Sequence, residues 1–253
     1  MSTAPASPPM ISVQDLWKSF GDNHVLTGIN LDIVEGSTCV ILGGSGSGKT
    51  VLMKHMIGLL KPDRGKVIVD GEDIVPMDER DLERVRRKFG MVFQGAALFD
   101  SMTVYENVSF ALREHTQLSE DQIRAKVREK LGIVGLQNVE ERYPAELSGG
   151  MRKRVGLARA IVLDPKIVLY DEPTTGLDPI TTDYVDDMIL TAKQELHVTQ
   201  VVISHDIASS FKVADKVAFL FKGKIVAEAP PRELRNNPHP ELQHFLQMWF
   251  GKS

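Results

Sequence analysis

The chain has 253 residues, of which 42% are hydrophobic and 25% are charged, which excludes disorder over most of its length. Its net charge of −4 argues against a broad basic surface for DNA or RNA. The single cysteine, Cys39, excludes an intrachain disulfide and favours a reducing compartment. No apolar run approaches the roughly 18 residues that span a bilayer, so we expect any membrane contact to go through a partner or the protein surface.

The N-terminal third predicts strands and two helices. Residues 1–10, rich in Ser, Pro and Ala, predict a disordered lead-in without the basic start and apolar stretch of a signal peptide. Short β-prone runs predict strands at 11–17, 25–33, 38–42, 66–70 and 90–93. Apolar residues at helical spacing predict a helix over 50–60, and a charged segment predicts a second over 79–88, capped by Asp78.

The middle of the chain predicts helices, and the last third predicts strands that alternate with helices. Helices are expected at 103–115, 119–134, 148–163 and 179–196, and Ser119 with Gln122 forms a plausible capping box. Strands are expected at 166–171, 199–204 and 216–221. Because strands and helices alternate at both ends, the pattern predicts a parallel α/β core with a helical insertion.

A glycine-rich segment between the strand 38–42 and the helix that follows fits the P-loop pattern in full. Its glycines let successive N–H groups face one anion, and the helix N-terminus adds partial positive charge. Lys49 would reach the β- and γ-phosphates of a nucleotide, and the Thr50 hydroxyl would bind Mg²⁺. The segment comprises Gly43, Gly44, Ser45, Gly46, Ser47, Gly48, Lys49 and Thr50.

Two carboxylates end the buried strand 166–171. Asp171 is placed to hold the hydration shell of Mg²⁺, as the acidic partner of a P-loop does. Glu172, one residue on, points elsewhere and could orient or deprotonate water. A third segment, Ser148 with Gly149 and Gly150, begins a helix, where Ser148 suits the N-cap and the glycines permit close approach of a ligand.

In their combination these motifs resemble the ATP-binding cassette (ABC) ATPases, over about residues 11–234. The resemblance implies a P-loop NTPase (RecA-like) core with a β-rich N-terminal subdomain and a helical subdomain at about 97–160. It identifies Ser148–Gly150 as the signature and assigns further residues by position. These are Gln94 in the Q-loop, Asp178 in the D-loop, His205 as the switch histidine and Phe20 as the adenine-stacking aromatic, with Trp17 as a nearby alternative.

The resemblance also implies a mechanism. Two such chains form a head-to-tail dimer with two ATP molecules at the interface, each between one P-loop and the partner's Ser148–Gly150. Glu172 acts on the attacking water, His205 and Gln94 sense the γ-phosphate and the metal, and Gln94 joins Thr50 and Asp171 around Mg²⁺. Catalysis of this kind depends on positioning and electrostatics.

The sequence departs from the usual family pattern directly after the signature. Met151 stands where the usual glutamine follows the signature, and the basic run Arg152–Arg154 comes next. A solvated helix face is favoured for that run over an anion patch. Residues 147–180 and 43–60 look most like the ATPases of Mla/Mce-type lipid transporters. This likeness implies a permease pair, an Mce-type lipid-binding protein, an accessory cytoplasmic subunit as a further candidate, and a peripheral position on the cytoplasmic face of the inner membrane.

Transport is favoured over a soluble cassette protein acting on DNA or ribosomes. The chain carries one cassette, and the segment between Gln94 and Leu147 leaves no room for a coiled-coil insertion. Because such an ATPase does not touch cargo, a phospholipid substrate rests on resemblance alone, and a polar solute is the alternative. A groove for the permease is expected near 95–103, where apolar Leu98, Phe99 and Met102 would pack on it or in the chain's own core.

The C-terminal tail, 235–253, predicts a short amphipathic helix. Its apolar residues recur at helical spacing, which makes one stripe. The stripe would dock on its own domain, on a neighbouring ATPase or accessory subunit, or on lipid, with Trp249 and Phe250 as candidate anchors. The residues of the stripe are Leu242, Phe245, Leu246, Trp249 and Phe250.

Overall fold

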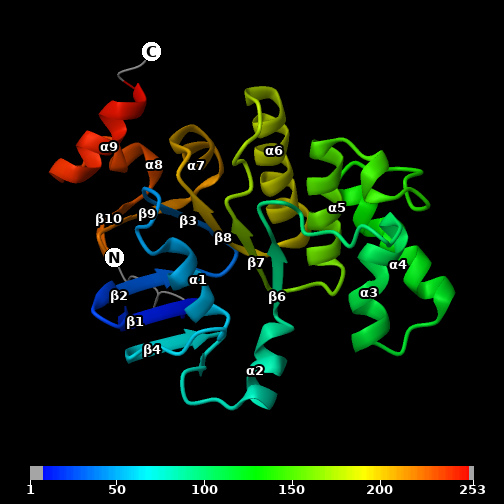
Figure 1. The fold of residues 1–253 in the computed structure, drawn as a ribbon, viewed down its shortest axis with the longest axis horizontal. Helices are drawn as coiled ribbons and strands as arrows, with labels where there is room; N and C mark the ends of the chain where they lie inside the picture. Colours follow the sequence, from blue (N-terminus) through cyan, green and yellow to red (C-terminus); the bar gives the residue numbers. More distant parts are fainter. Residues whose placement is uncertain (1–7, 251–253) are drawn as a thin grey trace, which may run out of the picture. The chain divides into compact units, whose positions relative to one another are not determined.

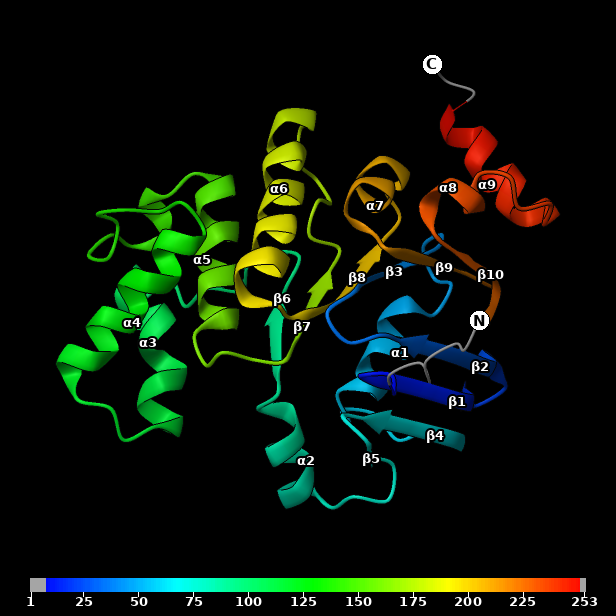
Figure 2. The same cartoon turned by 180° about the vertical axis from the view of Figure 1, so that it is seen from behind.

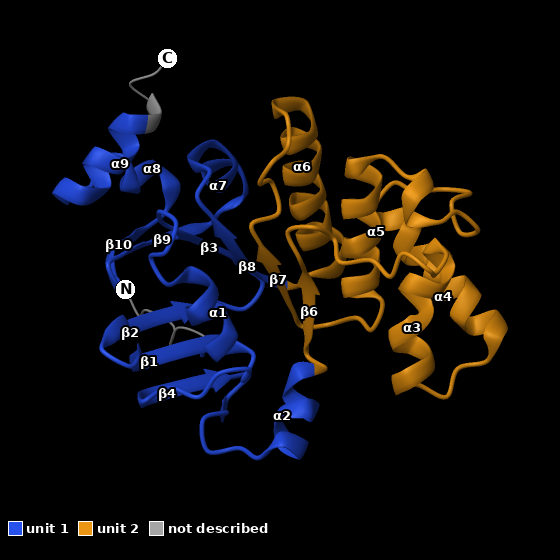
Figure 3. Cartoon of the chain, viewed as in Figure 1, with its two compact units in different colours: residues 1–86, 199–253 blue, residues 87–198 orange. Residues whose placement is uncertain are grey.

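The computed structural model describes residues 8–250. Its backbone divides into two compact units, one made of residues 1–86 and 199–253 and the other of residues 87–198 (Figure 3). The predicted lead-in, 1–10, lies mostly outside the described residues. No helix within 8–250 has the length and apolar character needed to cross a bilayer.

The first unit contains an antiparallel sheet in the order β2-β1-β4-β5 (Figures 1 and 2). From Ile29 to Ile33, β2 alternates buried apolar and exposed polar positions, as a strand with one solvated face does. A bulge interrupts β1 at Asp15, whose φ is 42°. The strands are β1 (Ile11–Phe20), β2 (Asn23–Ile33), β4 (Arg64–Val69) and β5 (Glu72–Asp73).

The same unit contains parallel strands built around β3 (Thr38–Leu42). β3 pairs in parallel with both β8 (Thr199–Ser204) and β9 (Lys216–Phe221), and β10 (Lys224–Ala229) runs antiparallel to β9. Every residue of β3 and β8 is buried, which is typical of parallel strands covered on both faces. The buried strands hold in place the loops that follow their carboxyl ends.

Helices cover these strands. α1 (Lys49–Met56) buries Leu52, Met53 and Met56, while α7 (Ile207–Val213) packs on β3 and β8 (Figure 1). α8 (Pro231–Leu234) packs on β9 and β10. The unit also contains α2 (Glu79–Arg86) and α9 (Pro240–Phe250).

The second unit joins two parallel strands to a group of helices. β6 (Phe89–Val92) pairs with β7 (Ile167–Asp171), and Val92 lies opposite Tyr170. α5 packs on β6 and against the other three helices (Figure 2). The helices are α3 (Val104–His115), α4 (Glu120–Ile133), the 3₁₀ turn η1 (Pro144–Glu146), α5 (Gly149–Ile161) and α6 (Pro179–Leu196).

The predicted mixed α/β class is confirmed, and so are most predicted elements. The capping box is present, because Ser119 Oγ accepts from Gln122 N at 3.4 Å and Gln122 Oε1 accepts from Ser119 N at 2.8 Å. The helix predicted over 50–60 is shorter, because the chain leaves it after Met56 and takes a left-handed turn at Gly58, φ 66°. The predicted bounds of the helical subdomain, 97–160, stay a prediction.

Candidate nucleotide-binding site

The P-loop joins β3 to α1 in a conformation that requires glycine at two positions. Gly48, the residue before α1, has φ 105°, a region that L side chains rarely adopt. A Cβ on Gly43 would lie 2.4 Å from the carbonyl oxygen of Leu220, so no larger residue fits there. The sequence therefore folds into a tight loop whose backbone amides precede a helix N-terminus, as anion binding requires.

Lys49 is the buried cation of this loop, with 5% of its surface exposed. Its ammonium donates hydrogen bonds to the carbonyl oxygens of Gly43, at 2.9 Å, and Gly44, at 3.0 Å. Ser47 Oγ is buried and has no hydrogen-bond partner among the described residues. A positive charge, an orphaned hydroxyl and the exposed Thr50 at the start of α1 fit a bound phosphate and its metal ion.

His205 lies at the same sheet edge as the P-loop. β3 and β8 are parallel neighbours with Leu42 opposite Ser204, and Gly43 N donates to Ser204 O at 3.3 Å. His205 follows directly and is exposed. The next residue, Asp206, caps α7 by accepting from Ser209 N at 3.2 Å, which fixes the chain direction after His205.

Two aromatic side chains near the end of β1 remain candidates for adenine stacking. The ring of Phe20 is 50% exposed and Lys18 Nζ lies 5.5 Å from its centre. Trp17 is 39% exposed, lies under the guanidinium of Arg64 at 5.9 Å and donates from Nε1 to Asp15 at 2.7 Å. Both rings have a cationic neighbour, and Phe20 keeps more of its surface exposed; adenine stacking by Phe20 stays a prediction.

In the second unit, β6 and β7 bring three predicted residues to one edge. Gln94 follows β6 and is exposed, while Asp171 ends β7 and Glu172 follows it. Glu172 has φ 49°, an uncommon conformation for a residue with a side chain, and one that clusters at functional sites. Thr175 Oγ1 donates to Glu172 Oε2 at 2.9 Å, which orients the carboxylate.

The predicted signature and D-loop residues cap two neighbouring helices. Ser148 Oγ accepts from Met151 N at 3.2 Å, so Ser148 is the N-cap of α5, as predicted. Asp178 caps α6 by accepting from the backbone of Ile180 and Thr181, each at 3.0 Å. The hydrogen bond from the Thr181 hydroxyl, at 2.6 Å, together with those from the backbone holds the pKa of Asp178 below its ordinary value.

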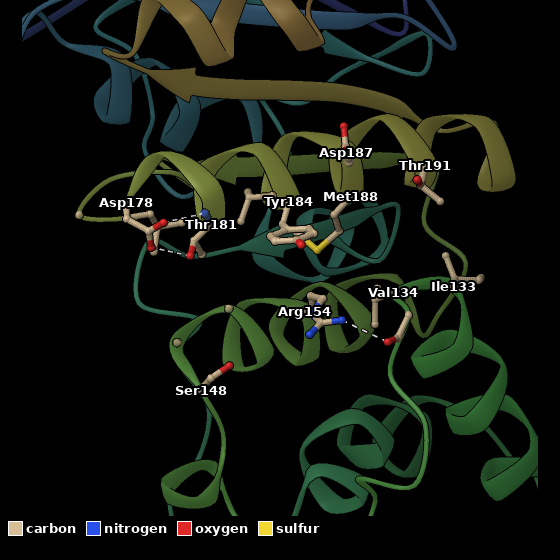
Figure 4. A pocket seen from close by; sticks show the side chains of 16 residues that line it. Ile133, Val134, Ser148, Arg154, Asp178, Thr181, Tyr184, Asp187, Met188 and Thr191 are labelled. Atoms are coloured by element: carbon tan, nitrogen blue, oxygen red, sulfur yellow. Dashed lines mark hydrogen bonds between the residues drawn. The ribbon is translucent and has the colours of Figure 1, made fainter.

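Ser148–Gly150 and Asp178 line one hollow of about 770 Å³ between α5 and α6 (Figure 4). Tyr184 and Met188 line it from α6, and Arg154 from α5. Arg154 Nη1 donates to Gly135 O at 3.1 Å. The glycines of the signature therefore border open space that a second molecule can enter.

Several residues that support these loops gave no signal in the sequence. The fully buried Asn107 donates to Phe99 O, at 3.1 Å, and accepts from Phe99 N, at 2.8 Å, so it shapes the segment after Gln94. Arg159 donates to the carbonyls of Ala96 and Ala97. Their roles depend on tertiary neighbours, which neither spacing nor composition encodes.

The solvated helix face predicted for the basic run Arg152–Arg154 is wrong at its middle residue. Lys153 is buried, with 8% of its surface exposed, and donates to the carbonyl oxygen of Pro173. Lys153 shares a helix face with the buried Leu157 and Ile161, in a helix that packs on β6 and against α3, α4 and α6. Arg152, beside it, is exposed.

Comparison with known proteins decides the family. The model of the ABC transporter family matches residues 26–175, more than half of the chain. The chain belongs to the ABC transporter family. As a member it is an ATP-binding ATPase, and the predicted P-loop NTPase fold is confirmed.

Individual relatives extend over nearly the whole chain. The probable ribonucleotide transport ATP-binding protein Mkl of Mycobacterium leprae is 44% identical, across 93% of this chain and 68% of its own length. The intermembrane phospholipid transport system ATP-binding protein MlaF of Escherichia coli is 39% identical, across 94% of this chain and 88% of its own. The ATP-binding cassette MJ0796, solved as a dimer with ADP and Pi, is 31% identical, with a TM-score of 0.79 over 88% of this chain and 99% of its own.

Proposed function

We propose that this ABC ATPase powers the movement of phospholipid through a partner permease. The observation that carries the proposal is the likeness to MlaF, because the two chains match along most of both lengths and MlaF is named for phospholipid transport. The ATPase has no contact with cargo in such a system. The lipid assignment therefore rests on this likeness and not on the nucleotide site.

ATP binding and hydrolysis would use the residues that follow β3 and β8 and those that follow β6 and β7. The P-loop amides and Lys49 would bind the phosphates, and Thr50, Asp171 and Gln94 would hold Mg²⁺. When bound, Mg²⁺ neutralises charge that develops on the phosphate oxygens. Glu172, oriented by Thr175, would accept a proton from the attacking water, while His205 and Gln94 would face the γ-phosphate and the metal. Phe20 would stack on the adenine.

Two copies of the chain would complete each site. The hollow beside Ser148–Gly150 supports entry of a nucleotide held by the P-loop of a second copy, and Asp178 lies on the same hollow. The dimeric MJ0796 cassette is a precedent for such pairing in a similar chain. Loss of the γ-phosphate would remove the charge that bridges the copies, so hydrolysis would open the dimer.

The permease would contact the segment after Gln94. Phe99 is 46% exposed and its ring centre lies 5.6 Å from that of Phe110, which is also exposed, whereas Leu98 and Met102 are half-buried. Phe99, on the loop that the buried Asn107 shapes, and Phe110, on α3, form an exposed aromatic pair that suits a partner of apolar character. With such a permease the chain would lie at the cytoplasmic face of an inner membrane, and an Mce-type protein and an accessory subunit would be further partners.

A polar solute is the second candidate, because the Mkl relative is 44% identical and is named for ribonucleotide transport. The chain spans about two thirds of the length of the Mkl relatives, against 88% of MlaF. The greater shared length favours the lipid assignment.

The test is reconstitution of the ATPase with its co-purified membrane partner in vesicles. ATP-dependent transfer of a fluorescent phospholipid is expected from the wild-type complex. Glu172→Gln should bind ATP normally and lose hydrolysis by roughly 10²-fold or more, as removal of a general base does, and transfer with it. Transport of labelled ribonucleotide with no lipid transfer would overturn the lipid assignment and leave the ATPase assignment intact.

A further inference from the structure

The helix that begins with the signature is tied directly to the loop that carries Glu172. Lys153 lies in the second turn of α5, and its ammonium donates to the carbonyl oxygen of Pro173, the residue after Glu172. Both residues belong to the second unit, and Pro173 and its neighbour Thr174 are buried. The contact therefore joins the helix of the signature to the loop of Glu172. In the proposed dimer these two segments serve different ATP molecules.

The surroundings of Lys153 are unusual for a lysine. The side chain is 8% exposed, and within residues 8–250 no carboxylate pairs with its ammonium. Burial lowers the pKa of the Lys153 amine. Burying an ammonium against a neutral carbonyl opposes folding, so stability alone gives no reason for a lysine at this position.

The segment that Lys153 holds is strained and carries the proposed base. Glu172 has φ 49°, and the turn after it closes through Thr175 N to Glu172 O at 3.3 Å. A left-handed conformation at a glutamate persists only when its surroundings fix it. Pro173 follows Glu172 directly, so a contact to its carbonyl oxygen restrains the backbone next to Glu172. Lys153 makes that contact.

We propose that Lys153 is a positioning residue, which holds Glu172 in its left-handed conformation and links that conformation to the position of Ser148–Gly150 on the same helix. The inference rests on the proposed roles of Glu172 and the signature. In a head-to-tail dimer the signature of one chain serves one ATP and its Glu172 serves the other. Lys153 then couples the two nucleotide sites within each chain.

The test replaces Lys153 with methionine, which keeps the length of the side chain and removes its donor. In the ATPase–permease complex, Lys153→Met should lower kcat for ATP by at least about tenfold, with KM changed by less than about threefold, because misplacement of a reacting group acts on the chemical step. Lys153→Arg, which keeps a donor, should recover part of kcat. The melting temperature of Lys153→Met should stay near that of the wild type, because the variant no longer buries a charge.

Lys130→Met is the matched control. Lys130 is a second buried lysine of the same unit, but its ammonium pairs with Asp164 and Glu129 and does not contact the Glu172 loop. Its loss should lower the melting temperature and leave kcat per folded complex unchanged. If Lys153→Met instead loses heat stability and keeps kcat, Lys153 is structural and the proposal is wrong.

A double variant separates this inference from the proposed function. In single-turnover hydrolysis, adding Lys153→Met to Glu172→Gln should cause no further loss, because Lys153 acts through the Glu172 carboxylate. A further tenfold loss would show an independent effect and overturn the inference. Near-normal hydrolysis by Glu172→Gln alone would instead overturn the role of Glu172 in the proposed function.

Discussion

The hydroxyl of Thr175 donates a 2.9 Å hydrogen bond to the carboxylate of Glu172, three residues earlier in the same turn. We expect Thr175→Val to lower kcat about tenfold with little change in KM for ATP, because the proposed base, Glu172, loses the hydrogen bond that orients its carboxylate. Thr175→Ser keeps the hydroxyl and should retain most of kcat. Steady-state ATPase assays on the purified complex measure this, and a wild-type rate in Thr175→Val would show that the hydrogen bond is not used in catalysis.

Substitutions of Lys49 and Glu172 should impair different steps, nucleotide binding and hydrolysis. Lys49→Ala removes the cation that donates to two carbonyls of its own loop and that we propose binds the β- and γ-phosphates, so nucleotide binding itself should weaken. Glu172→Gln should bind ATP and accumulate ATP-stabilised dimers. Light scattering after gel filtration with ATP distinguishes the two, and equal dimerisation of both variants would contradict this division of roles.

The sequence was most informative where local chemistry determines structure. The Gly43–Thr50 loop, the Ser119–Gln122 box and the Ser148 cap are encoded by neighbouring residues, so pattern alone located them. The sequence does not predict the strands β5 and β10 or the helices α7 and α8. β5, α7 and α8 contain too few residues to show a clear periodicity.

Supporting contacts of the site could not be predicted for a different reason. Lys153 sits in a basic run that suggests a solvated face, yet it is buried because of how α5 packs. Asn107 donates to the backbone carbonyl of Phe99, and Arg159 donates to that of Ala97, which is distant in the sequence. A backbone carbonyl is present at every position, so the sequence does not mark these two as partners. Such contacts exist only once the tertiary fold brings a backbone carbonyl within reach.

His55 makes the stability of the first unit depend on pH. Its ring is 1% exposed, Nδ1 donates to Val51 O at 2.7 Å, and Nε2 is buried with no hydrogen-bond partner among the described residues. Burial lowers the pKa of His55, the nearby charge of Lys18 lowers it further, and the hydrogen bond to Val51 and the charge of Asp63 act in the opposite direction.

Because this pKa is lower in the folded chain than the unfolded value of about 6.5, the unfolded chain takes up the proton first as the pH falls. The contribution of His55 is therefore intact above about pH 6.5 and is lost progressively below it. We expect the melting temperature of the wild type to fall more steeply below this pH than that of His55→Leu. Parallel curves in a pH series of thermal melts would show that His55 does not titrate on unfolding.

The C-terminal helix α9 packs on its own unit through part of the predicted stripe. Leu242 and Leu246 are buried, and the ring of Phe245 lies 5.1 Å from that of Phe219 in β9. Gln243 Nε2 donates to the carbonyls of Arg235 and Asn237, at 3.0 and 2.7 Å, which fixes the turn that leads into the helix. The side chains of Trp249 and Phe250, proposed as anchors, lie outside the described residues.

Since burying one leucine side chain contributes about 2 kcal/mol, loss of this contact should mainly destabilise the chain that carries it. We expect Leu246→Ala to lower the melting temperature of the isolated ATPase by several degrees, and ending the chain at Asn237 to lower it further. Met248→Ala, at a position that is 53% exposed on the same helix, is the matched control and should change little. ATPase rate per folded complex should remain near the wild-type value in all three. If instead the truncated chain melts normally while complex recovery falls, the stripe serves a partner, and its packing on β9 contributes little.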